Sequence, residues 1–259
     1  MTKKYRILPL TLLLAAPAFA TDSAGMDNWS LAGDKLGDLR GPLLPAGSWL
    51  VRGGLGTAHF KDGSSERIIL PEIAIGLPHR FEFRVLDELV SLSGGPASPT
   101  PETESESTGI LIPEVRWSVA PQGQMRGNPA LGIGSEIVPG DADILRATLY
   151  LNDSAGDHSV WGGNFIYQKR MGGDNELELI AKLGWHYLLQ PERVSLGIEA
   201  KFEHATTSGV EAETVQELLL GPSLIWKLGD HLRLRGFAEF GVTANSPKYE
   251  GAISLEWRH

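Results

Sequence analysis

Charged residues recur at every second position in several stretches of this chain, and these positions are the first candidates for chemistry. Residues 80–85 carry Arg, Glu and Arg on one alternating row and Phe, Phe and Val on the other. Residues 193–203 repeat the pattern, with Arg, Glu and Lys among small residues on one row and apolar residues on the opposite row. A guanidinium group and a carboxylate can form a bidentate ion pair, and the same groups can also line an aqueous pathway.

If these polar rows all face one enclosed space, they define a wall with acidic and basic residues in roughly equal numbers. The residues that we expect to line it are Arg52, Glu72, Glu82, Arg84, Glu114, Arg116, Glu136, Arg146, Asn164, Glu178, Lys182, His186, Glu199, Lys201, Arg233, Arg235 and Glu239. Glu217, Lys227 and Glu256 occupy equivalent positions, and Gln168 adds a hydrogen-bonding group. Two arrangements remain open: an ion-pair network that plugs the space, or the lining of a narrow pore, for which near-balanced charge predicts weak ion selectivity.

A hydrolytic site is the alternative chemistry. His204 falls at the end of an apolar row, a hydroxyl-rich run at 206–208 follows it, and Glu211 could orient the imidazole. A nucleophile must lie within about 3 Å of its base, and nothing in this spacing fixes that geometry. We therefore expect His204 to be an interfacial histidine, His186 to belong to a lumenal network, and the chain to have no enzymatic activity.

Metal and cofactor sites are not predicted. The chain contains no Cys, so it offers neither a disulfide nor a thiolate ligand. No pair of His residues has the spacing of a helical metal site, and Gly172-Gly173 is typical of a turn rather than a phosphate-binding loop. Glu102, Glu104 and Glu106 lack the spacing of a calcium loop and indicate a solvated acidic connection.

The elements that must position the charged rows are β-strands. Segments with a period of two follow one another from Gly47 onward, separated by clusters of Gly, Pro, Asn, Asp and Ser. We expect strands at about 47–60, 66–76, 80–90, 110–120, 129–138, 143–152, 158–168, 175–188, 192–204, 214–227, 231–242 and 248–257. Short connections favour an antiparallel up-and-down meander, and closure into an all-β barrel of about 12 strands would remove its two exposed edges.

Three features favour a barrel in a membrane over a soluble periplasmic or secreted β protein. The row opposite the charges is almost wholly aliphatic or aromatic, which is the pattern of apolar-out, polar-in barrels. Aromatic residues gather near the ends of the apolar rows, as interfacial girdles would: Trp49, Trp117, Trp161, Trp185, Tyr187, Trp226, Tyr249 and Trp257. The last expected strand alternates up to Trp257, which resembles the C-terminal signal of outer-membrane barrels, although Arg258 and His259 follow the aromatic residue.

The N-terminus predicts export. A basic start, an apolar run at 7–16 and the triplet Ala18-Phe19-Ala20 indicate a signal peptide over 1–20, cleaved before Thr21. Residues 21–46 show no clean period and are interpreted as a periplasmic lead-in, while 47–259 form the barrel. The longest connection, 91–108, would then face outward from a Gram-negative outer membrane. A net charge of -9 argues against nucleic acid as a partner. The expected partners are outer-membrane lipid, the barrel-assembly machinery during insertion and small solutes.

Two parts of the chain resemble a known family. The first comprises PAGSWLVRGGLG and RIILPEIAIGLPHRFEFRV, and the second comprises YLLQPERVSLGIEAKFE and IWKLGDHLRLRGFAEFGVT. These stretches are similar to the outer-membrane proteins grouped under the MetA pathway of phenol degradation, and the similarity covers most of 45–257. The resemblance implies an outer-membrane barrel that helps small organic compounds to cross, and it supplies no catalytic residues.

The sequence therefore favours a passive, porin-like channel or transporter for small solutes. A closed structural or adhesion barrel, with the 91–108 connection as its exposed feature, is the main alternative. A soluble secreted β protein and an outer-membrane lipid hydrolase are weaker alternatives. The sequence names neither the solute nor a gate.

Overall fold

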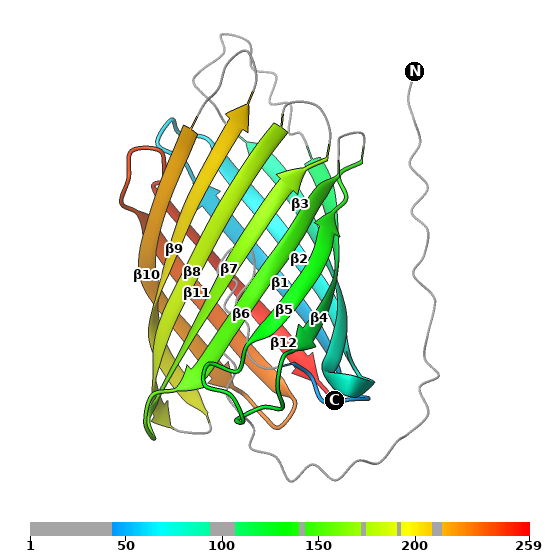
Figure 1. Ribbon diagram of the computed structural model, residues 1–259. Helices are drawn as coiled ribbons and strands as arrows, with labels where there is room; N and C mark the ends of the chain where they lie inside the picture. Colours follow the sequence, from blue (N-terminus) through cyan, green and yellow to red (C-terminus); the bar gives the residue numbers. More distant parts are fainter. Residues whose placement is uncertain (1–42, 94–106, 140–142, 172–174, 191–192, 209–213) are drawn as a thin grey trace.

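The computed structural model describes residues 43–93, 107–139, 143–171, 175–190, 193–208 and 214–259 (Figure 1). Within these ranges the chain forms β-strands and one short 3-10 helix, η1 (Pro78–Arg80). The strands are β1 (Trp49–His59), β2 (Ser65–Leu77), β3 (Phe81–Ser93), β4 (Ser107–Ser118), β5 (Ala130–Glu136), β6 (Ile144–Ser154), β7 (Ser159–Arg170), β8 (Asn175–Gln190), β9 (Val194–Ser208), β10 (Thr214–Lys227), β11 (Leu232–Gly241) and β12 (Tyr249–Arg258). No helix in the described ranges is long and apolar enough to span a membrane.

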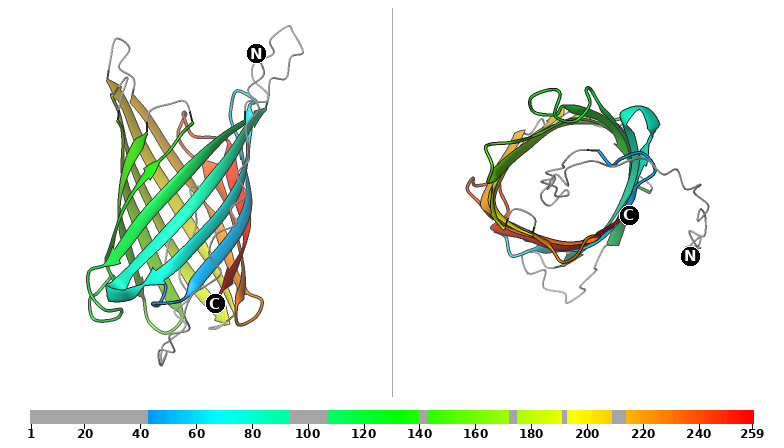
Figure 2. Two further views of the ribbon diagram at one scale, coloured as in Figure 1. Left: turned by 90° about the vertical axis from the view of Figure 1, so that its right-hand side faces the viewer. Right: turned by 90° about the horizontal axis from the view of Figure 1, so that it is seen from below.

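The twelve strands form one closed antiparallel barrel in which each strand pairs with its neighbours in the sequence. β1 and β12 complete the ring along their full lengths, and Trp49 and His259 exchange two backbone hydrogen bonds of 3.0 Å. The ring is visible in the view along its axis in Figure 2. The predicted closed meander is thus confirmed, and the pairing of β1 with β12 means that neither end of the meander is left as a free edge.

The two ends of the barrel are named here by the strand ends that they contain. β1 begins and β12 ends at what we call the terminus end, which lies at the bottom of Figure 1. The opposite end, where β1 passes into β2, is the loop end. Even-numbered strands therefore run from the loop end to the terminus end.

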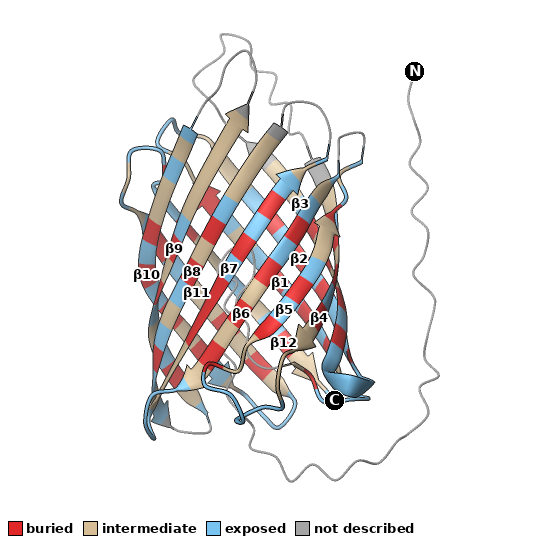
Figure 3. Ribbon diagram, in the orientation of Figure 1, coloured by how far each residue is buried: buried red, intermediate tan, exposed pale blue. Residues whose placement is uncertain are grey.

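Alternation along each strand separates an apolar outer face from an inner face with most of the charges. In β2, Ile69, Ile73 and Ile75 are exposed, while Glu72 and Ala74 between them are buried. The same alternation of buried and exposed positions crosses the other strands in Figure 3. Apolar side chains, which are unfavourable in water, face outward, and charged side chains face inward. This is the distribution of a transmembrane β-barrel.

The tryptophans of the described ranges gather at one end only. Trp49 and Trp161 lie at or near the starts of odd-numbered strands, and Trp117, Trp226 and Trp257 lie near the ends of even-numbered strands. All five positions, and Trp185 with them, belong to the half of the barrel at the terminus end. Trp49 and Trp257 pack with ring centroids 4.2 Å apart. At the loop end, Tyr249 stacks on His59 with ring centroids 5.3 Å apart. The girdle that the sequence predicts is therefore strongly biased towards the terminus end.

The inner face is not polar throughout. Ile68, Leu70, Leu86 and Ile112 form a buried inner cluster on β2, β3 and β4, and Val90, Ile110, Phe237 and Ala252 pack against it. We call these eight residues the inner apolar patch. The run of three apolar residues at 68–70 breaks the simple alternation, so an apolar side chain turns inward where a polar one is expected.

Some strand ends differ from the prediction for identifiable reasons. β5 is shorter than the expected 129–138: its ladder with β4 stops at Glu114↔Gly134 and resumes only as the single bridge Leu111↔Ile137. Pro113 lies between these pairs and has no N–H to donate. β8 and β9 extend beyond the expected ends to Gln190 and Ser208, because paired backbone groups continue past the last clear alternation.

Candidate functional site: the inner wall of the barrel

The inner wall holds the charged residues that the alternating rows single out. Sixteen of the seventeen expected lining residues are buried in the closed barrel, and Glu178 is half-buried. Since each lies on the inward row of its strand, the register brings residues far apart in sequence together. Two large groups and one small group of charged residues result, and the two large groups differ in their balance of acids and bases.

The first group is a band of alternating charges around half of the ring, which we call the arginine band. It comprises Arg235, Glu256, Arg52, Glu72, Arg84, Glu114, Arg116 and Glu82, on β11, β12, β1, β2, β3 and β4. Each of its four guanidinium groups has a carboxylate partner. Arg235 Nη2 lies 3.1 Å from Glu256 Oε2, and Arg52 Nε donates to Glu72 Oε2 over 3.0 Å. Arg233 and Arg258 also approach Glu256.

Arg84 joins two carboxylates and is the centre of the band. Its Nε lies 2.7 Å from Glu114 Oε2, and its Nη1 lies 3.8 Å from Glu72 Oε1. The side chain is fully buried. These approaches are ion pairs rather than aligned hydrogen bonds. Because a buried charge is costly unless it is paired, Arg84 depends on both neighbours and they depend on it.

Aromatic and hydrogen-bonding groups complete the band on the β4 side. The Tyr150 hydroxyl donates to Glu114, with distances of 2.7 and 2.9 Å to the two carboxylate oxygens. The Arg116 guanidinium lies over the Tyr150 ring, 4.2 Å from its centroid, and Arg116 Nη1 donates to Glu82 over 2.9 Å. The geometry of these contacts fixes the side chains at both ends of the Glu114–Arg116 segment.

A smaller group lies beside the band on β5, β6 and β7. Arg146 Nη1 is 3.5 Å from Glu136 Oε1, and Gln168 donates to the same carboxylate oxygen. Here again acid and base are present in equal number. The register places Arg146 opposite both Gly134 and Gln168, and a Cβ at Gly134 would overlap with the carbonyl oxygen of Pro113 on the neighbouring strand.

The second large group is an excess of carboxylates on β8 to β12, which we call the carboxylate cluster. It comprises Glu199, Glu203, Glu217, Glu239 and Glu250, with Lys182 and Lys201 as its bases. Lys201 Nζ lies 3.3 Å from Glu203 and 3.8 Å from Glu250. The register of the neighbouring strands places like charges directly opposite each other in this cluster: Glu239 faces Glu250, Glu203 faces Glu217, and Lys182 faces Lys201. Such pairs are destabilising, unlike the alternating pairs of the band.

His186 connects the carboxylate cluster to two hydroxyl groups. Its Nε2 lies 3.1 Å from Glu199 and 2.9 Å from Ser223 Oγ, and its Nδ1 lies 3.3 Å from Ser195 Oγ. The ring covers Gly197, whose missing side chain provides the space: a Cβ there would overlap with the imidazole. His186 therefore lies in a polar network, as predicted, and both of its ring nitrogens interact with side chains of the protein.

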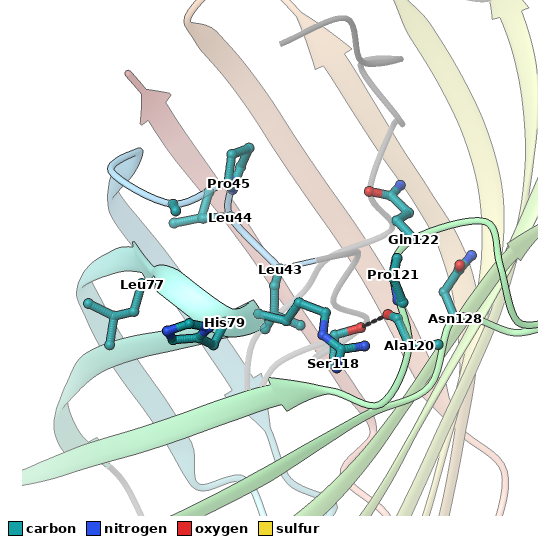
Figure 4. Close-up of a pocket in the computed structure, with 12 residues that line it drawn as sticks. Leu43, Leu44, Pro45, Leu77, His79, Ser118, Ala120, Pro121, Gln122 and Asn128 are labelled. Atoms are coloured by element: carbon teal, nitrogen blue, oxygen red, sulfur yellow. Dashed lines mark hydrogen bonds between the residues drawn. The ribbon is translucent and has the colours of Figure 1, made fainter. Parts of the chain in front are cut away.

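A pocket of about 270 Å³ opens beside the inner wall at the terminus end. Figure 4 shows that Leu43, Leu44 and Pro45 border it together with residues of the β2–β3 turn and the β4–β5 connection. Leu44 is buried with Leu50 and Ala74, and its backbone N–H donates to Glu82 Oε2 over 2.9 Å. The last residues of the expected lead-in therefore contact the arginine band; residues 21–42 lie outside the described ranges.

Gly76 explains how the chain passes this point. A Cβ at position 76 would overlap with the carbonyl oxygens of Leu44 and Pro45. Hydrogen bonds from Gly47 N to Gly76 O and from Gly76 N to Ser48 O, of 2.9 and 2.8 Å, tie the same segment to the wall. The glycine is required for close approach rather than for an unusual backbone angle.

The residues considered for hydrolysis are not brought together in the described part of the chain. His204 Nδ1 lies 3.3 Å from Gln216 Nε2, and the Thr206 hydroxyl donates to the carbonyl of Leu177. Glu211 and the connection 94–106, which includes Glu102, Glu104 and Glu106, lie outside the described residues. Among the residues that are described, no three His, Asp or Glu side chains form a group that could hold a metal ion.

Sequence reasoning left several inward polar residues out of the expected lining, although it had already placed Ser195 on a polar row. Glu250, Tyr150, Ser195 and Ser223 are buried on the inner wall, and each falls on the inward row of its strand. For Tyr150 the signal was available, because it shares its row with Arg146 and Thr148. For Glu250 the signal is weaker, since β12 has only Glu250 and Glu256 as charged residues on that row before Arg258.

Comparisons with known proteins bear on the fold. No family model matches the sequence, and no curated protein matches it either. In three dimensions the barrel is similar to the COG4313 outer membrane channel from Pseudomonas putida F1, with a TM-score of 0.57 and 12% identity over 84% of this chain and 97% of that chain. It is also similar to the translocator domain of the autotransporter NalP from Neisseria meningitidis, with a TM-score of 0.54 and 12% identity over 83% of this chain and 90% of that chain. The chain therefore has the fold of outer-membrane β-barrels.

Proposed function

We propose that the protein is an outer-membrane channel through which small solutes pass passively. The observation that carries the proposal is the inner wall: a closed twelve-stranded barrel whose inward rows are rich in charged and hydrogen-bonding side chains, with an apolar face turned outward. Twelve strands enclose more space than the eight that side chains alone fill, and less than the 16 or more of the wide porins. The expected lining residues would form the walls of that pathway.

The outer surface supports the location and orientation. Exposed aliphatic side chains suit a hydrocarbon layer, and the tryptophans at the terminus end suit the polar–apolar boundary. We place this end in the periplasm, with export by the signal peptide at 1–20, the lead-in at 21–46 and the barrel at 47–259. The lipid around the barrel and the barrel-assembly machinery would then be its partners in the membrane.

The family relationship remains part of the proposal. The stretches around 45–85 and 187–243 resemble the outer-membrane proteins grouped under the MetA pathway of phenol degradation, which would point to small organic compounds as solutes. The likeness to solved structures at 12% identity concerns the fold, so the channel activity rests on the inner wall of this chain. We propose no catalytic role for His204, whose Nδ1 lies beside the side-chain amide of Gln216.

Conductance tests the proposal directly. The outer-membrane fraction is first examined for a band that migrates faster unboiled than boiled, and the same purified protein is then added to a planar lipid bilayer. Discrete conductance steps, absent from an extract of cells that lack the protein, are expected. A heat-modifiable band without any conductance would overturn the channel and leave the barrel.

A closed structural barrel is the second candidate, and the arginine band favours it. Arg52 and Arg84 are almost completely buried and are paired with the buried carboxylates Glu72 and Glu114, as in a network that fills the interior. This candidate predicts a folded, heat-modifiable protein that conducts no ions. If the barrel serves adhesion, deletion of the 91–108 connection would abolish surface binding.

A further inference from the structure

We propose that the inner wall selects cations, and amphipathic organic cations in particular, through the carboxylate cluster and the inner apolar patch beside it. The proposal rests on the channel function and names its solute class. Its first support is the charge balance of the cluster, in which five carboxylates share two lysines. The arginine band, by contrast, pairs each of its four carboxylates with a guanidinium group.

Two carboxylates of the cluster each have an oxygen to which no described group of the protein donates a hydrogen bond. Glu239 and Glu250 are 1% and 3% exposed, and they lie directly opposite each other on β11 and β12. Within the described residues, Glu239 Oε2 and Glu250 Oε1 accept no hydrogen bond. A buried carboxylate without a donor is costly, and two of them side by side repel each other. A proton or another cation from solution would relieve both costs.

Within the described residues, two lysines supply the positive charge that acts on Glu239. The charges that act on Glu239 are the carboxylates of Glu250 and Glu199 and the ammonium groups of Lys182 and Lys201. Lys201 is itself shared with Glu203 and Glu217, and Glu66 adds a further negative charge near Glu217. His186 lies between Glu199 and two hydroxyl groups, so a positive charge on it would offset one carboxylate at most.

An apolar surface lies next to these carboxylates. Phe237 and Ala252 form the inward pair next to Glu239 and Glu250 along the same two strands, and both pack against Ile68, Leu70, Leu86 and Ile112. A solute that follows this wall meets negative charge and hydrocarbon side by side. An amine that carries an alkyl or aryl group has the matching chemistry, since it can place its ammonium group at Glu239 and Glu250 and its apolar part against Phe237 and Ala252, which are partly buried members of the patch.

The positive charges of the described wall lie mostly in another part of it. The four guanidinium groups of the arginine band are engaged by Glu256, Glu72, Glu114 and Glu82. Arg233 and Arg258 add positive charge beside Glu256, at the terminus end of the wall, whereas Glu239 and Glu250 lie towards the loop end. Equal totals of acid and base along the sequence would predict weak selectivity. Segregation of the two groups onto different parts of the wall changes that expectation to cation preference.

Selectivity is measured on the full-length protein in planar bilayers under a potassium chloride gradient. We expect a reversal potential whose sign shows that potassium is more permeant than chloride. The variants E239Q and E250Q, singly and together, should lower the potassium-to-chloride permeability ratio by about threefold per carboxylate, the effect of one charge acting through water at about 7 Å. The same neutralisation at a site outside the wall, D62N, should leave the ratio unchanged.

Asp62 is a matched control because it is a charged carboxylate at the same end of the barrel. It lies in the β1–β2 connection and is exposed. Hydrogen bonds from Ser64 N and Oγ, of 2.9 and 2.6 Å, hold the pKa of Asp62 below its ordinary value, so it is ionised at neutral pH. Heat-modifiable migration checks that each variant folds, and E199Q with E217Q replaces the first pair if that pair fails to fold.

The apolar part of the proposal has its own test. Phenethylammonium should block the potassium current at a concentration roughly tenfold lower than ethylammonium does, since its ring buries several more CH₂-sized units. F237S should abolish that difference and keep the potassium preference. A wild-type channel without cation preference, or glutamine variants with unchanged selectivity, would overturn the inference alone. A protein without conductance would overturn the channel as well.

Discussion

The arginine band and the carboxylate cluster lie on the same inner wall but arrange their charges in opposite ways. In the band, every charge lies beside one of the opposite sign, and Arg84 contacts both Glu72 and Glu114. In the cluster, the register sets Glu239 against Glu250 and Glu203 against Glu217. The band is therefore built as a scaffold that neutralises itself, and the cluster stores unfavourable electrostatic energy.

This difference suggests a division of labour along the wall. Self-paired charges hold their neighbours in place and would attract few mobile ions, because their fields cancel over short distances. Uncompensated carboxylates attract cations from solution. Sites of function often retain interactions that stability alone would remove, and the cluster is the part of this wall that fits that description.

The sharpest way to break the comparison is to remove one charge from the band. R84M should destabilise the barrel by about 3–5 kcal/mol, because it leaves Glu72 and Glu114 buried with one partner fewer. Urea unfolding in lipid vesicles, followed by loss of heat-modifiable migration, measures the change. The double variant R84M/E114Q should recover part of the loss, since it removes the orphaned charge as well.

The outcome of that pair tests the scaffold interpretation of the band. If R84M alone left stability unchanged, the ion pairs around Arg84 would contribute nothing and the band would not differ from the cluster. A loss without any recovery in the double variant would assign the effect to packing of the Arg84 side chain rather than to charge.

A second prediction concerns the place where the lead-in meets the band. G76A should cost about 1–3 kcal/mol, because its methyl group overlaps with the carbonyl oxygens of Leu44 and Pro45 and forces the backbone to move. Hydrogen exchange at Leu44 should become faster, since the bond to Glu82 is strained or lost. G53A is the matched control, as nothing lies within 4 Å of a Cβ there. Equal effects of the two variants would contradict this reading of Gly76.

Much of the fold could be predicted because its physical signal is local. The period of two, as in residues 193–203, fixes which side chains face inward, and short turns fix the order of the strands. The closed barrel could be predicted from these signals together with the need to pair the backbone groups of the first and last strands. Strand ends such as those of β5 escaped prediction, because they depend on which residue of the neighbouring strand lies opposite, here Pro113.

The grouping of the charges could not be predicted in the same way. The sequence indicates that Arg52 and Glu239 share a polar wall, but the register decides that one has a salt-bridge partner and the other faces a like charge. A shift of two residues between neighbouring strands would keep every residue on its face and exchange these partners. The inner apolar patch was missed for a related reason: Phe237 and Ile112 are joined only by closure of the barrel.

The smallest effect is expected in the cluster, and it has the opposite sign to that in the band. E239Q should stabilise the barrel by about 0.2–1 kcal/mol, because it removes one member of a like-charged cross-strand pair and retains the shape of the side chain. The measurement is the same unfolding experiment, in low salt, where the gain should be largest. High salt or added phenethylammonium should stabilise the wild type more than E239Q, since both supply the cations that the two carboxylates attract. If E239Q destabilised the protein as R84M does, Glu239 would have a protein partner, and the two regions would follow one rule rather than two.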